Sequence, residues 1–391
     1  CLILPAAYLA RDLRPLETVV AITVALMAAA ASHRWVEEPF RRSTVLSRRR
    51  LRALVLWPVA VGLVLATVGA VQLQQEWQRN HEGGYAQPDV DPEPDNRQTS
   101  TDPLINDVGF AAELARASEP LPAALHPALT DLLADVTPLS GYDNKDYTCY
   151  AQKPQETSKV CTTGAADGKQ TIVALGDSHM GMWLAPITRV ASQQGMKLVP
   201  LLKQRCLPFD VLQYEADLGR PYDECSAHTA WAERKTAELR PDVIVVSALY
   251  FTDLVDPESR QQVRGKGNTD LFEQGLRPAL ARLSKLADRV VLIGPTPFKR
   301  STAADCLASR RATMGTCKRR LTNRLAERDE ELRTAAAATG VTYLSPLPWF
   351  CDSMRTCPLV VRDRIVYRDD THITQTYALR LEPVFKAVLT Q

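Results

Sequence analysis

The sequence predicts an α/β domain, in which helices cover both faces of a parallel sheet, preceded by transmembrane α-helices. Two observations support this prediction. Beyond Lys169, short apolar segments alternate with amphipathic ones, a pattern typical of strands that alternate with helices. Before residue 75, two stretches are apolar and carry no charged side chain, as expected of membrane spans.

The expected strands and helices of the domain follow one another along the chain. Apolar runs predict the strands Thr171–Leu175, Lys197–Leu202, Asp242–Ser247, Arg289–Ile293 and Val341–Leu344. Amphipathic segments predict the helices Met182–Gln194, Ala227–Leu239, Leu271–Ala287 and Thr322–Thr339, and a weaker helical pattern covers Ala111–Val136. No glycine-rich phosphate loop follows the first strand, which argues against a nucleotide-binding site.

Two stretches near the N-terminus predict membrane spans. Thr18–Ser32 is uncharged but short, whereas Ala53–Leu73 has 21 uncharged residues, enough to cross a bilayer. The loop between them carries Arg41, Arg42, Arg48, Arg49, Arg50 and Arg52, with no acidic residue among them. Since short cytoplasmic loops accumulate arginine, we expect a multi-pass protein of the cell membrane, with its C-terminal domain outside the cytoplasm. A buried helical hairpin of a soluble protein is the alternative.

The segment from Glu76 to about Pro120 is rich in Pro, Asp, Gln, Asn and Gly, which predicts a flexible extracytoplasmic linker. The expected division is therefore membrane helices in residues 1–75, a linker in 76–120 and the domain in 121–391. The chain begins at Cys1 in an apolar stretch. We expect this start to fall inside or beside a membrane helix, with a lipoprotein cysteine as the alternative.

Eight of the nine cysteines follow residue 148 and stand in close pairs: Cys149/Cys161, Cys206/Cys225, Cys306/Cys317 and Cys351/Cys357. This even number favours disulfides and an oxidising compartment. Nearest-neighbour pairing is the simplest connectivity, although the sequence leaves other pairings open. Zinc is the alternative, but no CxxC occurs and the histidines lack zinc-finger spacing, so we expect no metal.

Residues suited to nucleophilic chemistry stand near the two ends of the expected domain. Ser178 lies in the Gly-Asp-Ser-His sequence of Gly176–His179, directly after the first strand, where its hydroxyl and its amide N–H can reach the carboxyl edge of the sheet. A serine hydroxyl needs a base and an orienting acid, and His372 stands three residues after Asp369. A helix N-cap at Ser178 and a surface turn at Asp369 are the alternatives.

The segment from about Cys149 to Leu389 resembles the SGNH hydrolase-like domain attached to membrane acyltransferase-3 proteins of the O-antigen and wall-glycan O-acetyltransferase type. Gly176–His179 is similar to the first block of that family, and Asp369–Thr374 is similar to its last block. Further similar pieces are Arg205–Pro208, Cys351–Pro358 and, as the end of the last acyltransferase-3 helix, Trp35–Arg41.

This resemblance implies a three-layer α/β/α SGNH domain of flavodoxin-like architecture. It also implies that Ser178 is the nucleophile, His372 the general base and Asp369 the orienting acid, with Asp370 less suited to orient the base. Family members contribute an oxyanion glycine after the second strand and an asparagine after the third, and neither is evident here. The oxyanion donors are then the amide of Ser178 and a second backbone amide near Gln204.

The resemblance implies an envelope O-acyltransferase that passes an acyl group, taken to be acetyl, to hydroxyls of an extracytoplasmic glycan. We expect no bound cofactor, because a Ser–His–Asp mechanism needs none. The resemblance implies that the acyl donor is ultimately acyl-CoA, delivered through a membrane domain expected upstream of residue 1 or through a separate membrane protein. The formal net charge of only +2 gives no reason to expect a nucleic-acid partner. A carbohydrate O-acetyl esterase and a non-catalytic glycan-binding module with a vestigial triad are the alternatives.

A basic stretch lies beside Cys306 and Cys317 and comprises Arg310, Arg311, Lys318, Arg319 and Arg320. We expect it to form a solvated helix face, with contact to an anionic glycan as the alternative.

Overall fold

The computed structural model describes residues 100–138, 148–298 and 302–390, together with scattered positions between 19 and 69. Most of the two expected membrane spans and the expected linker before residue 100 therefore lie outside the described residues. Within the residues that are described, no helix combines the length and the hydropathy needed to cross a membrane.

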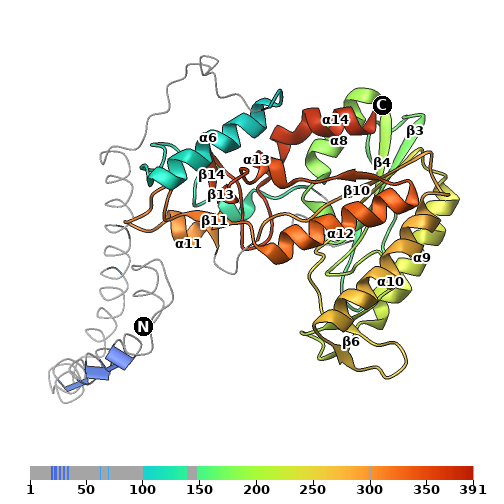
Figure 1. Ribbon diagram of the computed structural model, residues 1–391, viewed down its shortest axis with the longest axis horizontal. Coiled ribbons are helices and arrows are strands. Elements are labelled where there is room, and N and C mark those ends of the chain that lie inside the picture. The colour runs from blue at the N-terminus through green and yellow to red at the C-terminus, as the bar shows by residue number, and fades with distance from the viewer. Residues whose placement is uncertain are drawn as a thin grey trace, which may run out of the picture.

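A parallel sheet forms the centre of the domain (Figure 1). Its strands lie in the order β1 (Tyr150–Ala151), β4 (Met196–Lys203), β3 (Gln170–Gly176), β7 (Val243–Ser247), β10 (Arg289–Ile293) and β12 (Thr342–Leu344). Each neighbouring pair in this order is parallel, and the short β2 (Thr163–Gly164) adds antiparallel to β4. All five predicted strands are confirmed, each within one residue of its expected ends.

Successive side chains of the central strands enter two separate apolar clusters, because neighbouring residues of a strand point to opposite faces. In β3, Ile172 and Ala174 belong to one cluster, whereas Val173 and Leu175 belong to the other. The first face is covered by α8 (Leu184–Gln194) and α14 (Glu382–Leu389), and the second by α9 (Asp223–Leu239), α10 (Lys266–Leu283) and α12 (Asn323–Thr339). The three-layer α/β/α architecture is thus confirmed.

The four helices predicted within the domain are all present, but two of them begin earlier than expected. Helix α9 starts at Asp223, because Asp223 and Glu224 in its first turn favour a helix N-terminus. Helix α10 runs from Lys266 to Leu283, ahead of its expected range at both ends. Helix α12 begins as predicted, since the Thr322 hydroxyl accepts a hydrogen bond from the Leu325 N–H.

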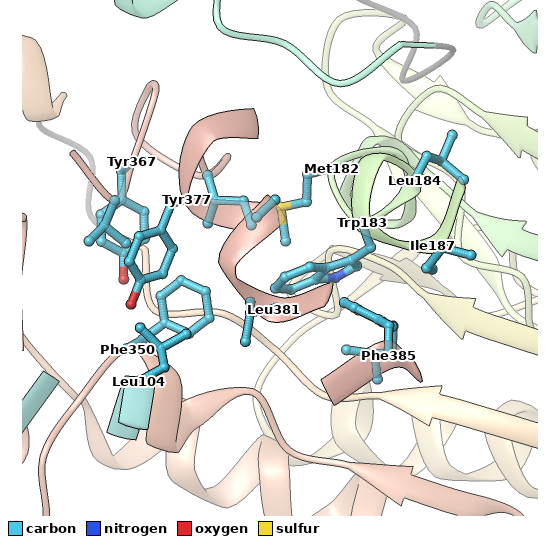
Figure 2. Close-up of a cluster of buried hydrophobic side chains, with 14 of the residues drawn as sticks. Leu104, Met182, Trp183, Leu184, Ile187, Phe350, Tyr367, Tyr377, Leu381 and Phe385 are labelled. Carbon is cyan, nitrogen blue, oxygen red and sulfur yellow. The ribbon is translucent and has the colours of Figure 1, made fainter. Parts of the chain in front are cut away.

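Aromatic side chains join the segment after Ser178 to the C-terminal segment (Figure 2). The Trp183 ring lies 5.8 Å from that of Phe385 and 6.2 Å from that of Phe350, and Phe350 lies 5.6 Å from Tyr377. All four side chains are buried. Burial of each ring contributes roughly 2–3 kcal/mol of hydrophobic stabilisation, so this cluster holds together two parts of the chain that are nearly 200 residues apart in sequence.

Helix α6 (Pro103–Ala117) occupies part of the expected linker, so the domain boundary predicted at residue 120 is wrong. Asp102 caps the helix by accepting the Leu104 N–H at 2.9 Å, and Pro103 suits the first helical position. Leu104 and Val108 are buried in the first cluster, so the domain includes this helix. The apolar face of α6 consists mostly of alanines, which is why the polar composition around it conceals it in the sequence.

The weak helical pattern over Ala111–Val136 is also wrong for most of its length. Helix α6 ends at Ala117, where Ser118 adopts a left-handed conformation, and only a 3-10 turn at Leu132–Ala134 follows. The remaining elements are the strands β5 (Leu212–Glu215), β6 (Arg220–Pro221), β8 (Leu254–Val255), β9 (Gln262–Val263), β11 (Lys318–Arg320), β13 (Thr356–Pro358), β14 (Val360–Val361) and β15 (Arg364–Ile365), the short helices α7 (Ser178–Gly181), α11 (Ala303–Leu307) and α13 (Gln375–Ala378), and the 3-10 turns Leu347–Trp349 and Leu379–Leu381.

The four nearest-neighbour disulfides are confirmed: Cys149–Cys161, Cys206–Cys225, Cys306–Cys317 and Cys351–Cys357. The last two brace one piece of structure. Cys317 directly precedes β11 and Cys357 lies in β13, and these two strands pair antiparallel. This braced pair of strands lies beside the segment that carries Asp369 and His372, as described below.

The docking of α6 depends on Asp107, whose carboxylate accepts hydrogen bonds from Arg362, at 2.8 Å, and from Arg380. Asp107→Ala leaves both partly buried arginines without this partner and should lower the free energy of unfolding by about 2–3 kcal/mol. Denaturant titration of the full chain measures the change. Asp167→Ala, at an exposed position, is the control and should change it by less than about 0.5 kcal/mol. Equal effects of the two substitutions would contradict the assignment of α6 to the domain.

Candidate active site

Ser178 stands at a sharp turn between β3 and α7. Gly176 ends the strand with φ of +147°, and a Cβ atom there would lie 1.8 Å from the carbonyl oxygen of Ser247, so only glycine fits. Asp177 then caps α7, since its carboxylate accepts the N–H of His179 at 2.8 Å. Helix α7 therefore begins at Ser178, as the strand-to-helix turn in the sequence predicts, and Asp177 takes the N-cap role.

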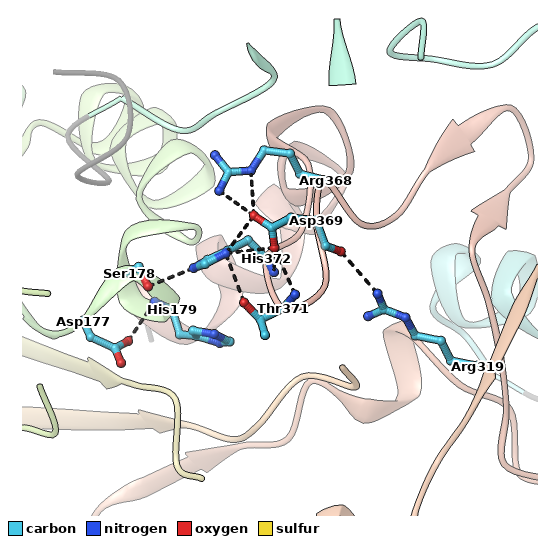
Figure 3. Close-up of polar contacts among 8 residues, drawn as sticks. All are labelled: Asp177, Ser178, His179, Arg319, Arg368, Asp369, Thr371 and His372. Carbon is cyan, nitrogen blue, oxygen red and sulfur yellow. Dashed lines mark hydrogen bonds and ion pairs between the residues drawn. The ribbon is translucent and has the colours of Figure 1, made fainter. Parts of the chain in front are cut away.

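The structure brings Ser178, His372 and Asp369 together, as the sequence analysis expects (Figure 3). His372 Nε2 lies 2.8 Å from Ser178 Oγ, and its Nδ1 lies 3.0 Å from each carboxylate oxygen of Asp369. Ser178 and His372 are 7 % and 9 % exposed, so little water reaches the pair. A hydroxyl, an imidazole and a carboxylate in this order form the arrangement that activates a serine nucleophile.

The Asp369 carboxylate is held by its own loop. It accepts the backbone N–H groups of Thr371, at 2.9 Å, and His372, at 2.7 Å, and it pairs with the guanidinium of Arg368 at 2.8 Å. Burial alone would raise the pKa of this carboxyl, but the hydrogen bonds from His372 and the charges of His372 and Arg368 outweigh burial and leave the pKa well below its ordinary value. The Asp369 carboxyl is therefore ionised at neutral pH.

The basic stretch forms no helix face, so that expectation is wrong: Arg310 and Arg311 lie in a turn, and Lys318–Arg320 form β11. Arg319 is also not solvated. Its guanidinium is buried, lies 3.7 Å from the centre of the Tyr367 ring and donates to the carbonyl oxygens of Pro297, at 3.1 Å, and Asp369, at 3.2 Å. Because Arg319 belongs to β11, the disulfide-braced pair of strands supports the backbone that carries Asp369. The run of basic residues gives no signal that distinguishes this one.

Asp177 links the Ser178 turn to the loop after β7. Besides the His179 N–H, it accepts the backbone N–H of Leu249, which lies 3.1 and 3.2 Å from its two carboxylate oxygens. Burial raises the pKa of the Asp177 carboxyl to about 6, although these two N–H groups oppose the shift. The carboxyl ends of the neighbouring strands β3 and β7 are thus tied together beside the nucleophile.

His179 is a buried neighbour of the site that the sequence analysis missed. Its ring centre lies 5.0 Å from that of His372 (Figure 3). Burial, and to a smaller extent the charge of His372, hold the pKa of His179 well below its usual value, so this imidazole stays neutral. A neutral ring beside His372 does not compete for the proton that His372 must accept.

The two expected oxyanion donors, the backbone N–H groups of Ser178 and Gln204, differ in whether the fold already uses them. The Ser178 N–H belongs to the first turn of α7, where backbone N–H groups have no acceptor within the helix. The Gln204 N–H, by contrast, donates to the carbonyl oxygen of Ala151 at 2.9 Å. Gln204 is therefore not a free backbone donor, because the short strand β1 alongside β4 uses its amide. The sequence did not predict β1, so this correction could not be foreseen.

Among the described residues, no group of histidine, cysteine and carboxylate side chains is arranged to hold a metal ion. The eight cysteines of the domain are all bonded in pairs.

The raised pKa of Asp177 gives a pH dependence of stability with a defined sign. Between about pH 4 and pH 6 the native state binds more protons at this carboxyl than the unfolded chain does, so the free energy of unfolding falls as the pH rises. A carboxyl pKa raised from its usual value to about 6 corresponds to about 3 kcal/mol of free energy. Urea unfolding between pH 4 and pH 7 should show this fall in the parent and not in Asp177→Asn. Asp167→Asn is the control and should keep the slope of the parent; an unchanged slope in Asp177→Asn would refute the assignment.

Comparison with solved structures finds similar chains at low sequence identity. The periplasmic domain of a lipopolysaccharide acetyltransferase from Salmonella ser. Paratyphi A has a TM-score of 0.45 and 15% identity, over 75% of this chain and 98% of that one. A putative GDSL-like lipase from Parabacteroides merdae has a TM-score of 0.34 and 11% identity, over 58% and 99% of the two chains. An acetylxylan esterase from Geobacillus stearothermophilus has a TM-score of 0.31 and 11% identity, over 57% and 95%. Comparison with curated proteins gives no match.

Comparison with protein-family models finds one that matches residues 148–387, more than half of the chain. Its description is the SGNH domain that is fused to AT3 domains. The match begins after the stretches expected to span the membrane, and it contains Ser178, Asp369 and His372. The chain therefore belongs to the family of SGNH domains fused to AT3 domains, and it is an acyltransferase or an ester hydrolase of the SGNH type.

Proposed function

We propose that the protein is an envelope O-acyltransferase, which passes an acyl group, taken to be acetyl, through Ser178 to hydroxyls of an extracytoplasmic glycan. The observation that carries this proposal is the hydrogen-bonded series Ser178–His372–Asp369, with distances of 2.8 and 3.0 Å. The family of SGNH domains that are fused to AT3 domains supports a transferase, because an adjoining membrane domain provides a route for an acyl donor.

In the first half-reaction, Ser178 Oγ attacks the acyl carbonyl carbon while His372 Nε2 takes the hydroxyl proton. The bond from the acyl carbon to the donor then breaks, and the leaving atom takes the proton from His372. The anionic Asp369 holds His372 with Nε2 towards the serine, and it stabilises the imidazolium that forms between the two steps. Negative charge on the carbonyl oxygen develops near the N–H of Ser178 at the start of α7.

In the second half-reaction, a sugar hydroxyl attacks the acyl–Ser178 ester while His372 takes the proton of that hydroxyl. The new bond joins the sugar oxygen to the acyl carbon, and the bond from that carbon to Ser178 Oγ breaks. His372 returns its proton to Ser178, which restores the enzyme. With water as acceptor the same steps give a carbohydrate O-acetyl esterase.

The proposed location is outside the cytoplasm, at the cell membrane. The four disulfides support it, since such bonds persist in oxidising compartments. The apolar stretches at 18–32 and 53–73, with the arginines between them, would anchor the domain with its C-terminal part outside. A membrane acyltransferase domain or a separate membrane protein would then supply acyl groups that originate from acyl-CoA.

An activated Ser178 predicts covalent labelling by a fluorophosphonate probe. Intact-mass analysis of the full chain should show one adduct on the parent and on the control Ser259→Ala, and none on Ser178→Ala, because only an activated hydroxyl attacks the probe. Spectra with and without reductant count the disulfides of the same samples. A folded, fully oxidised parent without any adduct would favour the vestigial-site alternative.

Loss of the orienting carboxylate predicts a large kinetic effect. Asp369→Asn should lower the rate of p-nitrophenyl acetate turnover by about 10³–10⁴-fold, because the amide favours the wrong tautomer of His372 and cannot stabilise the imidazolium. The neighbouring Asp370→Asn should change this rate by less than about threefold. Similar rates for the two variants would rule out Asp369 as the orienting acid. Rapid release of acetate without any sugar acceptor would favour the esterase over the transferase.

A further inference from the structure

Two loops at the carboxyl edge of the sheet connect to both halves of the candidate active site. The loop after β7 includes Leu249, whose N–H donates to the carboxylate of Asp177, directly before the nucleophile. The loop after β10 includes Pro297, whose carbonyl oxygen accepts from Arg319. Arg319 in turn donates to the carbonyl oxygen of Asp369. The side chains that follow in these two loops therefore lie at the rim of the site.

The two loops are joined to each other and present a pair of phenylalanines. Between Leu249 and Phe251, the buried Tyr250 donates its hydroxyl to the carbonyl oxygen of Ile293 at the end of β10, at 2.6 Å. The ring of Phe251 then lies 5.1 Å from that of Phe298, at an interplanar angle of 53°. Both phenylalanines are partly exposed, whereas Phe272 nearby is 1% exposed.

A polar cavity of about 370 Å³ adjoins Phe251, a volume that suits a small-molecule or sugar subsite. Its lining carries three cationic and three anionic side chains: Arg264, Arg324, Arg328, Asp253, Glu327 and Glu331. The exposed guanidinium of Arg324 lies 5.1 Å from the centre of the Phe251 ring. The buried Arg328 lies 2.9 Å from Glu331 in an ion pair and stacks on Phe272, so the position of this lining residue is fixed.

We propose that Phe251, Phe298 and this cavity form the acceptor subsite, which holds an uncharged sugar ring of the glycan. A pyranose ring has a face of C–H groups, which packs on aromatic rings, and an edge of hydroxyls, which needs polar partners such as Arg324 and Thr252. The equal numbers of opposite charges in the lining favour a neutral polyol over a polyanion. The proposal rests on the proposed function, because it takes the acyl group to leave Ser178 for a sugar hydroxyl held here.

The test separates acceptor binding from acyl chemistry. The first measurement is saturation-transfer NMR on the full-length Ser178→Ala chain, with methyl glycosides of glucose, galactose, mannose, rhamnose and N-acetylglucosamine as probes. The second is turnover of p-nitrophenyl acetate by chains that retain Ser178, with the same glycosides as acceptors, read as the ratio of acetylated glycoside to released acetate. Phe251→Ala, Phe298→Ala and Arg324→Ala are compared in both with Phe110→Ala, a phenylalanine on α6 that is 42% exposed.

The subsite predicts that at least one glycoside binds the Ser178→Ala chain, and that adding Phe251→Ala or Phe298→Ala weakens its binding by about tenfold, as loss of a central aromatic contact does. The transfer-to-hydrolysis ratio should fall by a similar factor, whereas Phe110→Ala should leave both unchanged. Arg324→Ala should also weaken binding. Because this position is exposed, the substitution does not disturb the fold, and misfolding is excluded as the cause. Binding that no substitution weakens, or no binding of any probe, would overturn the subsite. If these substitutions weaken sugar binding but chains that retain Ser178 transfer no acyl group to any glycoside, the result would support the subsite and count against the proposed function alone.

Discussion

The Asp369 carboxylate is the group on which the arrangement of the candidate site depends. It orders its own loop through the N–H groups of Thr371 and His372, pairs with Arg368 and holds the His372 imidazole towards Ser178. A partly buried carboxylate is costly unless its lone pairs are satisfied, and here each oxygen has more than one partner. The cost of burying the charge is thereby offset by contacts that also fix the geometry of the base.

Two unrelated kinds of contact bring this loop to the nucleophile. On one side, the rings of Trp183, Phe350 and Phe385 bury the segment after Ser178 against the C-terminal helices. On the other, Arg319 fastens the backbone of Asp369 to a pair of strands that two disulfides brace. Hydrophobic burial supplies most of the free energy that holds the two segments together, and the braced polar contact fixes the orientation of the loop. Neither contact can therefore replace the other.

The sequence predicts the repetitive part of the fold well and its irregular part poorly. The central strands are apolar runs with sharp ends, so periodicity places β3 and β7 within one residue. The sequence does not predict helix α6, because half of its buried residues are alanines in a polar setting. It does not predict the short strand β1, because two residues are too few to show a periodic pattern. In the site, Ser178 and His372 stand in motifs, whereas Arg319 resembles its solvated neighbours until β11 and β13 pair.

Whether such a site transfers or hydrolyses is decided by competition at one ester. Water is present at its bulk concentration, so a glycan hydroxyl must be held at a higher effective concentration to intercept the acyl group. Positioned groups reach effective concentrations far above that of any solvent, but only when the acceptor is held in the correct orientation near the reacting carbon. Ser178 and His372 are almost closed to solvent, which limits hydrolysis without favouring any sugar. In the proposed acceptor subsite, a preference for a sugar would arise at Phe251 and Phe298, which lie within two residues of the contacts that build the site.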